Sequence, residues 1–420
     1  MLIAVLIACS SHAPGLAPDL GQGVVVADAV GGVCVSVQLD RWNPDHRATM
    51  VAALQSMGVR ELRHDLVWSY VERARGEYDW STEDSWVDAA SGFEVIAMTG
   101  YGNPWASSDP AADDYYPPDD PADFATFAGL AAARYGESID RYEIWNEPNS
   151  GFRFWKVGDP PAISGDPVGY ASLFVPAADA IHAARPEAEV EVGGTFFLPT
   201  GIIGGANFVR QAANSNPAFL QSADAVAYHP YTTYPPRVGP EDDEGDEEPI
   251  WQMQADMRDA SGDALPLAVT EAGWPSWGTV SEDDQAAMLL RGFALAQADG
   301  VKDYCAYTLE DFEDTDNPEG DFGLYRYGAT ERKPAGDAWA SIGANIDGMD
   351  CNGRAEEALG LPDGVFAVRW SSDSGTATLL WTTAGEQKVT VLASTGLAGP
   401  ETVTVSETPV WVRQLPQRFE

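Results

Sequence analysis

The sequence predicts a (β/α)8 barrel, or TIM barrel, followed by a small antiparallel β-sandwich domain. Two observations carry this prediction. Over about 300 residues, eight short β-rich runs alternate with helical stretches, and after Gly348 the pattern changes to strands without helices. The chain has 420 residues, which suits a barrel of about 250 residues with an accessory domain. A doubly wound sheet would need fewer strands and a glycine-rich first turn, which is absent.

The barrel is assigned to 31–347 from its alternating strands and helices. The strands are predicted at Gly32–Gln38, Glu61–Asp65, Glu94–Thr99, Arg141–Trp145, Val190–Gly194, Ala223–Tyr228, Leu265–Thr270 and Asp303–Thr308. The helices are predicted at Asp45–Met57, Asp123–Tyr135, Tyr170–Ala184, Phe208–Asn214, Trp251–Ser261 and Glu282–Asp299.

The accessory region, 348–420, begins with a predicted linker at Asp347–Pro362. From Val365 to Leu415 apolar and polar residues alternate in five runs separated by turn residues, which is typical of antiparallel strands. Its three tryptophans are Trp370, Trp381 and Trp411. They alternate with apolar residues as core residues do, so we interpret this domain as a structural accessory rather than as a ligand-binding module.

The composition excludes several classes of protein. The chain has 24 Lys and Arg against 65 Asp and Glu, a net charge of −41 that repels nucleic acid and anionic membranes. A salt-adapted surface and an acidic secreted protein both remain open as interpretations of this charge. There is no CxxC pair, HExxH motif or GxxxxGK[ST] loop, so zinc-ribbon, zincin and P-loop chemistry have no support. We expect no metal and no organic cofactor.

Residues 1–30 are predicted to be a targeting segment and tether. The apolar run is too short to span a bilayer, which takes about 20 residues, and it ends in Leu-Ile-Ala-Cys. This ending resembles a bacterial lipobox, so we favour an exported lipoprotein anchored through Cys9 over a plain signal peptide. No Lys or Arg precedes the run, which leaves open a start placed too late or a segment that is not a working signal.

Two glutamates lie where barrel enzymes form their active sites. The fourth predicted strand ends in EIWNEPN, which contains Asn146 and Glu147, and the seventh ends in VTEAGWPS, which contains Glu271. Active sites form at the C-terminal ends of barrel strands, so the two carboxylates would face each other across the barrel mouth. In glycoside hydrolysis one such group protonates the leaving oxygen and the other attacks or activates water.

These motifs resemble those of clan A glycoside hydrolases, the retaining (β/α)8 enzymes, and most of all family 39 and its relatives. The resemblance covers 32–345 and includes the segments GVRELRHDLVWSYVERARGEYDW, GYGNPWASS, WNEPNSGFRFW and YCAYTLEDFEDTDNPEGDFGLYRYGATERKPAGDAW. It implies that Glu147 is the general acid/base and Glu271 the nucleophile, about 5–5.5 Å apart. It also implies that Arg63 donates to Glu271 and that Asn146 donates to the sugar 2-hydroxyl.

His229 and Tyr231 end the sixth strand, where the resemblance implies groups that hydrogen-bond the nucleophile or the sugar. A satisfied core histidine is the other interpretation of His229. Arg63 and its neighbour His64 face opposite ways on a strand, and we expect Arg63 to face inward.

Four further residues are candidates for lining the sugar site: Asn103, Trp105, Trp155 and Trp274. Packing in the core or within a loop remains an open interpretation of the three tryptophans. Clan A barrels often carry a tryptophan at the end of strand 8, where this chain has Tyr307. The site for the reacting sugar is therefore expected to be wider, or built from Tyr307 or Glu310.

Cys34 and Cys305 lie in the first and last strands, which are neighbours in a closed barrel. Adjacent thiols are slightly favoured over a bridge, because cross-strand bridges strain the geometry. The partner of Cys351 is open. The acidic run 241–248 is interpreted as a solvated loop rather than a calcium site. The run 314–317 with Asp321 lacks the full calcium-loop pattern and is interpreted as a turn-rich loop.

The predicted function is a retaining glycoside hydrolase that cleaves β-glycosidic bonds of an oligo- or polysaccharide by double displacement. The alternative is a catalytically silent carbohydrate-binding surface lipoprotein on the same barrel. The sugar, the linkage, exo or endo action and the oligomeric state remain open.

Overall fold

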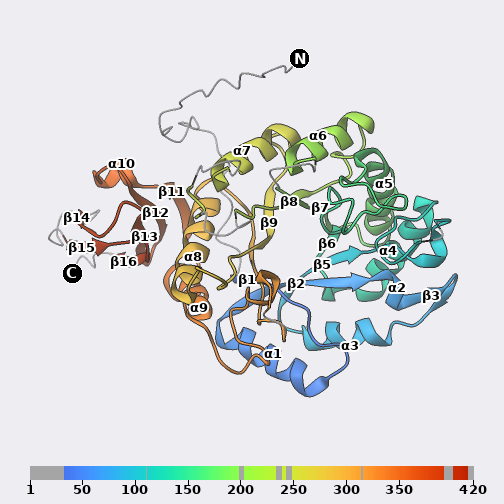
Figure 1. Ribbon diagram of the computed structural model, residues 1–420, viewed down its shortest axis with the longest axis horizontal. Helices are drawn as coiled ribbons and strands as arrows, with labels where there is room; N and C mark the ends of the chain where they lie inside the picture. Colours follow the sequence, from blue (N-terminus) through green and yellow to red (C-terminus); the bar gives the residue numbers. More distant parts are fainter. Residues whose placement is uncertain are drawn as a thin grey trace, which may run out of the picture.

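The computed structural model describes residues 33–109, 111–197, 203–232, 239–242, 248–313, 316–391 and 401–414. Over these ranges the chain forms a closed barrel of eight parallel strands surrounded by helices, and antiparallel sheets pack beside α8 and α9 (Figure 1). The predicted fold class is confirmed. The predicted targeting segment with Cys9, and parts of both acidic runs, lie outside the described residues.

The barrel strands are β1 (Val33–Ser36), β2 (Val59–Val67), β5 (Glu94–Gly100), β6 (Arg141–Ile144), β7 (Glu189–Phe196), β8 (Ala225–His229), β9 (Leu267–Ala272) and β10 (Tyr304–Tyr307). Each overlaps a run predicted from the sequence. β1 closes the barrel by pairing in parallel with both β10 and β2. Parallel barrel strands are covered on both faces, which explains their short, mostly buried runs.

The longer helices are α1 (Pro44–Ser56), α3 (Ser81–Ala89), α4 (Pro121–Tyr135), α5 (Pro167–Ala184), α6 (Gly205–Ser215), α7 (Ile250–Ser261), α8 (Glu282–Ala298) and α9 (Pro334–Ile346). Local sequence defines several starts: Asp120 and Asp166 cap α4 and α5, each followed by proline. The prediction omitted α3 and α9, because α3 is short and polar and α9 contains two glycines.

Shorter elements lie in the loops: α2 (Trp68–Val71), β3 (Glu72–Ala74), β4 (Glu77–Tyr78), η1 (Pro104–Ala106), η2 (Gly136–Ser138) and η3 (Pro318–Gly320). Among the described residues, none of the helices combines the length and the apolar character that crossing a bilayer requires.

The accessory region consists of β11 (Asp350–Arg354), α10 (Glu356–Leu359), β12 (Val365–Ser372), β13 (Gly375–Thr382), β14 (Gln387–Val391), β15 (Glu401–Val405) and β16 (Val410–Gln414). One sheet has the order β11-β12-β13-β16, and β14 pairs with β15. The prediction of a linker at 347–362 is wrong for most of that segment, because β11 pairs with β12 and Leu359 is buried. Trp370 and Trp381 are fully buried, consistent with core packing.

A buried polar contact joins the accessory sheet to the barrel. The Trp381 indole donates to the Glu241 carboxylate at 2.6 Å, and Arg291 of α8 pairs with the same oxygen at 3.1 Å. Burial raises the pKa of Glu241, and Arg291 offsets only part of that effect. The solvated-loop interpretation is therefore wrong for Glu241, because two donors compensate its burial.

The interior of the barrel carries charged side chains as well as apolar ones. Arg141 of β6 forms ion pairs with Glu61 of β2, Glu191 of β7 and Asp303, which directly precedes β10. Burial raises the pKa of Glu191 to about 7, although Arg141 opposes the shift. Buried charges of this kind persist only with close partners, so this cluster restricts the relative positions of the strands.

Cys34 and Cys305 form a disulfide between β1 and β10. The two residues lie in register, with Cα atoms 4.4 Å apart, which is within the range for a disulfide. The slight preference for free thiols is wrong, because register places the two Cα atoms at bonding distance. Cys351 is a free cysteine, half-buried in β11.

Replacing Cys34 and Cys305 together with alanine should lower the free energy of unfolding by about 2–4 kcal/mol, because the cross-link restricts the unfolded chain. Chemical denaturation followed by tryptophan fluorescence measures this difference. Added reductant should lower the wild-type midpoint and leave that of the variant unchanged. Equal midpoints without reductant would contradict a stabilising bridge.

Candidate active site

A cavity of about 600 Å³ opens at the C-terminal ends of the barrel strands. It is lined by both predicted catalytic residues, Glu147 and Glu271, together with Asn146, Tyr231 and Tyr307. Its volume lies within the range of about 300–1,000 Å³ that ligand pockets occupy.

The two carboxylates are close together and nearly buried. Glu147 follows β6 and is 5% exposed, while Glu271 lies near the end of β9 and is 9% exposed. One oxygen of each, together with a ring nitrogen of His229, lies within 4.8 Å of the others. The sequence-based expectation that these side chains meet at the barrel mouth therefore agrees with the geometry.

The backbone that carries Glu147 is strained. Trp145 and Glu147 have φ angles of 71° and 43°, in the left-handed region that side-chain-bearing residues rarely adopt. Hydrogen bonds hold this turn: Trp145 donates its amide to Thr99, and Glu147 donates its amide to Gly194 at 2.9 Å. A Cβ atom on Gly193 would collide with the carbonyl of Trp145, so the adjacent strand needs a glycine there.

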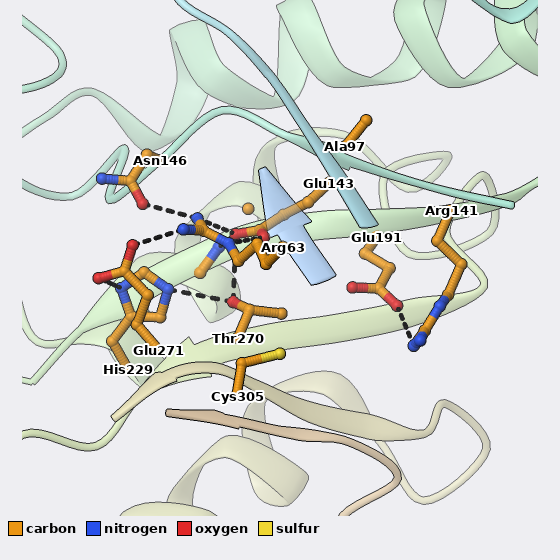
Figure 2. A network of polar contacts seen from close by, with 12 residues as sticks. Arg63, Ala97, Arg141, Glu143, Asn146, Glu191, His229, Thr270, Glu271 and Cys305 are labelled. Atoms are coloured by element: carbon orange, nitrogen blue, oxygen red, sulfur yellow. Dashed lines mark hydrogen bonds and ion pairs between the residues drawn. The ribbon is translucent and has the colours of Figure 1, made fainter. Parts of the chain in front are cut away.

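Arg63 of β2 lies between Glu143, Asn146 and Glu271 and is almost completely buried (Figure 2). Its guanidinium donates to both oxygens of Glu143, at 2.6 and 3.0 Å, and to Glu271. It also donates to the Asn146 side-chain oxygen at 2.8 Å. Burial lowers the pKa of Arg63, but Glu143 and Glu271 outweigh that effect and raise it, so the guanidinium stays charged.

Sequence reasoning missed Glu143, which is fully buried. Besides the Arg63 guanidinium, it accepts hydrogen bonds from the Gly194 amide at 2.7 Å and the Thr270 hydroxyl at 3.3 Å. Strand alternation could have found it, because Arg141 and Glu143 are both charged and lie on the same face of β6.

His229 connects the two carboxylates to this buried layer. Its Nδ1 lies 3.0 Å from Glu147 Oε1 and 3.8 Å from Glu271 Oε2. Its Nε2 lies 3.1 Å from the Thr270 hydroxyl (Figure 2). The Thr270 hydroxyl donates to Glu143, so the Thr270 oxygen accepts a hydrogen bond from the Nε2–H group of His229. Nδ1 therefore faces Glu147 Oε1, and a proton on either group can bridge the two.

Glu271 is held by several positive groups. Burial raises its pKa, but the charges of His229 and Arg63 and a hydrogen bond from Tyr231 outweigh burial and lower it. The Tyr231 hydroxyl donates to Glu271 Oε2 at 3.1 Å. The environment therefore favours an ionised Glu271.

The expected opposite orientations of Arg63 and His64 are observed. His64 stacks on Trp86 at 4.0 Å, away from the guanidinium cluster. Tyr307 lines the cavity, and its ring lies 6.4 Å from that of Tyr231. Asp65, which also lines the cavity, was not among the sequence candidates.

The four residues that were expected to line the sugar site do not line this cavity, and that expectation is corrected: Asn103, Trp105, Trp155 and Trp274. Asn103 and Trp105 instead donate to the backbone carbonyl of Glu72, at 2.7 and 2.8 Å. Trp155 and Trp274 are 1% and 2% exposed and belong to the hydrophobic core. Burial in the core prevents these two rings from contacting a sugar.

Two groups of side chains have atoms spaced for a metal ion among the described residues. In the first, Cys34 and Cys305 are already joined in a disulfide beside Glu61. In the second, the two catalytic candidates and His229 are already engaged by hydrogen bonds and by Arg63. We assign no metal to either group.

Several solved structures that resemble this chain are glycoside hydrolases. A family 39 enzyme from Bacteroides cellulosilyticus WH2 superposes with a TM-score of 0.71 at 21% identity, covering 91% of this chain and 80% of that one. A family 39 β-xylosidase from Caulobacter crescentus gives 0.59 at 19% identity and covers 94% of both chains. A family 30 endoxylanase from Clostridium papyrosolvens C71 gives 0.56 at 11% identity, with coverages of 93% and 95%.

No protein-family model matches the chain, and no curated protein matches it. At the identities of these solved structures, the likeness establishes a shared fold alone. That fold is the barrel of family 39 and family 30 glycoside hydrolases.

Replacing Glu143 with glutamine should lower the free energy of unfolding by about 3–5 kcal/mol, because Arg63 would keep a buried charge with one partner fewer. The matched control is Glu94→Gln on the exposed start of β5, which should change stability by less than about 0.5 kcal/mol. Denaturant unfolding measures both. Equal effects would contradict the role assigned to Glu143.

Glu271 should stabilise the protein in a pH-dependent way. Its pKa is below its ordinary value of 4.5 in the folded protein, so the unfolded chain takes up the proton first as the pH falls. Its contribution is present above about pH 4.5 and is lost below it. The stability advantage of wild type over Glu271→Gln, measured by denaturant unfolding from pH 7 to pH 3, should shrink below that point. A constant difference would contradict the lowered pKa.

Proposed function

We propose that this chain is a retaining glycoside hydrolase that cleaves β-glycosidic bonds of an oligo- or polysaccharide. One observation carries the proposal: two buried carboxylates, Glu147 and Glu271, present oxygens within 4.8 Å of each other in a cavity at the barrel mouth. Carboxyl groups of retaining enzymes lie about 5–5.5 Å apart, whereas inverting enzymes need a wider separation to hold a water molecule.

Glu271 suits the role of nucleophile. Its lowered pKa keeps it ionised, and Arg63 and Tyr231 hold its two oxygens in place. In the first step it attacks the anomeric carbon and forms a covalent glycosyl–enzyme as the bond to the leaving oxygen breaks.

Glu147 suits the role of general acid/base. In the first step its proton moves to the leaving oxygen, and in the second it takes a proton from the water that attacks the anomeric carbon. Water releases Glu271 with net retention of configuration. The contact with His229 Nδ1 holds the carboxyl group, and the strained backbone positions it.

Asn146 is oriented for the substrate. Its side-chain oxygen accepts from Arg63, which directs its amide N–H groups to donate elsewhere, and the residue lines the cavity. A hydrogen bond from this amide to the sugar 2-hydroxyl would strengthen in the transition state.

The similar structures include enzymes described as a β-xylosidase, a glucosidase and an endoxylanase, which supports a β-linked saccharide as the substrate. We further propose that the chain is exported and anchored through Cys9. The disulfide between Cys34 and Cys305 supports export, because such bonds persist in oxidising compartments.

Replacing Glu147 with glutamine should slow the hydrolysis of substrates with poor leaving groups by about 10²–10⁴-fold, and that of activated aryl glycosides much less. Steady-state rates on a panel of aryl β-glycosides and β-linked oligosaccharides, in low and high salt, measure this difference. Equal loss on both kinds of substrate would contradict the role of acid.

The same panel tests the reaction class. Proton NMR of the first-formed product should show the β-anomer, and Glu271→Ala should release no sugar. An α-anomer as first product would contradict retention. Inactivity of the wild type on the whole panel, with retained binding of oligosaccharides, would favour the silent carbohydrate-binding protein.

A further inference from the structure

The cavity extends outward from the catalytic carboxylates to a group of exposed aromatic side chains, which we call the aromatic rim. The rim comprises Trp42, Tyr70, Phe312 and Tyr327, which are 71%, 37%, 44% and 53% exposed and all line the cavity. These are four of the six exposed aromatic residues among those described. Large apolar side chains that gather at the edge of a cavity mark a ligand-binding surface.

Trp42 is exposed, but its backbone is held. Asp40 accepts hydrogen bonds from the amides of Trp42 and Asn43, at 2.8 and 2.7 Å. The His46 imidazole lies 3.1 Å from Asp40 and 3.0 Å from Glu310, which follows β10. These contacts tie the loop after β1 to the loop after β10. The backbone that carries the indole is therefore held in place, which lowers the entropy cost of binding.

Tyr70 stands beside Trp42. The two ring centroids are 6.5 Å apart and the planes are inclined by 58°. The Arg41 guanidinium lies 5.5 Å from the Tyr70 ring and so restricts that side chain as well. Two inclined and exposed rings at the edge of a cavity form a shallow angle, into which the apolar C–H face of a sugar ring can pack.

The charged groups in this part of the cavity are paired, with no surplus of positive charge. The two arginines that line the cavity, Arg41 and Arg153, lie 3.7 Å from Glu83 and 3.5 Å from Glu319. His46 lies between the carboxylates of Asp40 and Glu310. The chain as a whole carries a charge of −41, which repels anionic saccharides. The surface therefore suits a neutral sugar.

We propose that Trp42 and Tyr70 form a binding platform for a second sugar unit of a neutral, β-linked saccharide, next to the unit that reacts between Glu147 and Glu271. This inference rests on the proposed function, and it makes chains of two or more neutral sugar units the preferred substrates. The platform contributes binding energy away from the reacting bond, which can be used to position that bond.

Binding to the Glu271→Gln protein tests the platform without hydrolysis. The probes are xylo- and cello-oligosaccharides of one to five units, and affinity is measured by calorimetry. Probes of two units should bind at least about 10-fold more tightly than the single sugar, and Trp42→Ala should remove most of that gain. The matched control is Trp277→Ala, because Trp277 is 37% exposed and does not line the cavity.

Wild-type kinetics separate the failure of the platform from the failure of the proposed function. The ratio of kcat/KM for the oligosaccharide to that for the aryl monoglycoside should fall about 10-fold in Trp42→Ala and stay unchanged in Trp277→Ala. An unchanged ratio, or affinity that does not depend on chain length, would overturn the platform and leave the hydrolase intact. Length-dependent binding that needs Trp42, without any hydrolysis, would support the platform and overturn the hydrolase. Binding of no probe would overturn the platform.

Discussion

The buried guanidinium of Arg63 is the interaction on which the site depends. It joins three barrel strands by donating to Glu143 beneath it and to Asn146 and Glu271 above it. A buried charge is tolerated only when its partners are in place, so this one side chain requires a particular register of β2, β6 and β9. The same contacts keep Glu271 ionised and orient the amide of Asn146. The same contacts therefore fix both the register of these strands and the geometry of the candidate active site.

The position of the Glu147 carboxylate depends on a strained backbone turn and on neighbouring glycines. Glu147 lies on a turn with positive φ angles, which persists because neighbouring strands hold it by hydrogen bonds. Gly193 and Gly194 allow β7 to approach this turn and His229 closely. His229 then contacts both carboxylates and, through Thr270, the Glu143 carboxylate. Glu147 and Glu271 thus differ in the groups that hold them: His229 contacts Glu147, whereas Arg63 and Tyr231 donate to Glu271.

The accessory domain is joined to the barrel by buried side-chain contacts. Its buried Trp381 donates to Glu241 in the loop after β8, and Arg291 of α8 pairs with the same carboxylate. This buried contact attaches Glu241 both to the accessory domain and to helix α8 of the barrel. The tryptophans of the domain that are fully buried cannot contact a saccharide, whereas the aromatic rim belongs to the loops of the barrel.

The sequence by itself determined the order of the eight strands, the two facing glutamates and the inward orientation of Arg63. The strand order and the facing glutamates follow from local periodicity and from the rule that barrel active sites form at strand ends. The orientation of Arg63 follows from strand alternation together with the resemblance to family 39. Only the tertiary structure decided the bridge between Cys34 and Cys305, the burial of Trp155, Trp274 and Glu241, the place of Glu143 beneath the site, and the grouping of the aromatic rim. Each of these depends on strand register or on contacts between residues far apart in the chain. Composition and local pattern do not reveal such contacts. A tryptophan or glutamate with the same local sequence can lie in the core or line a cavity, and only its tertiary partners decide which.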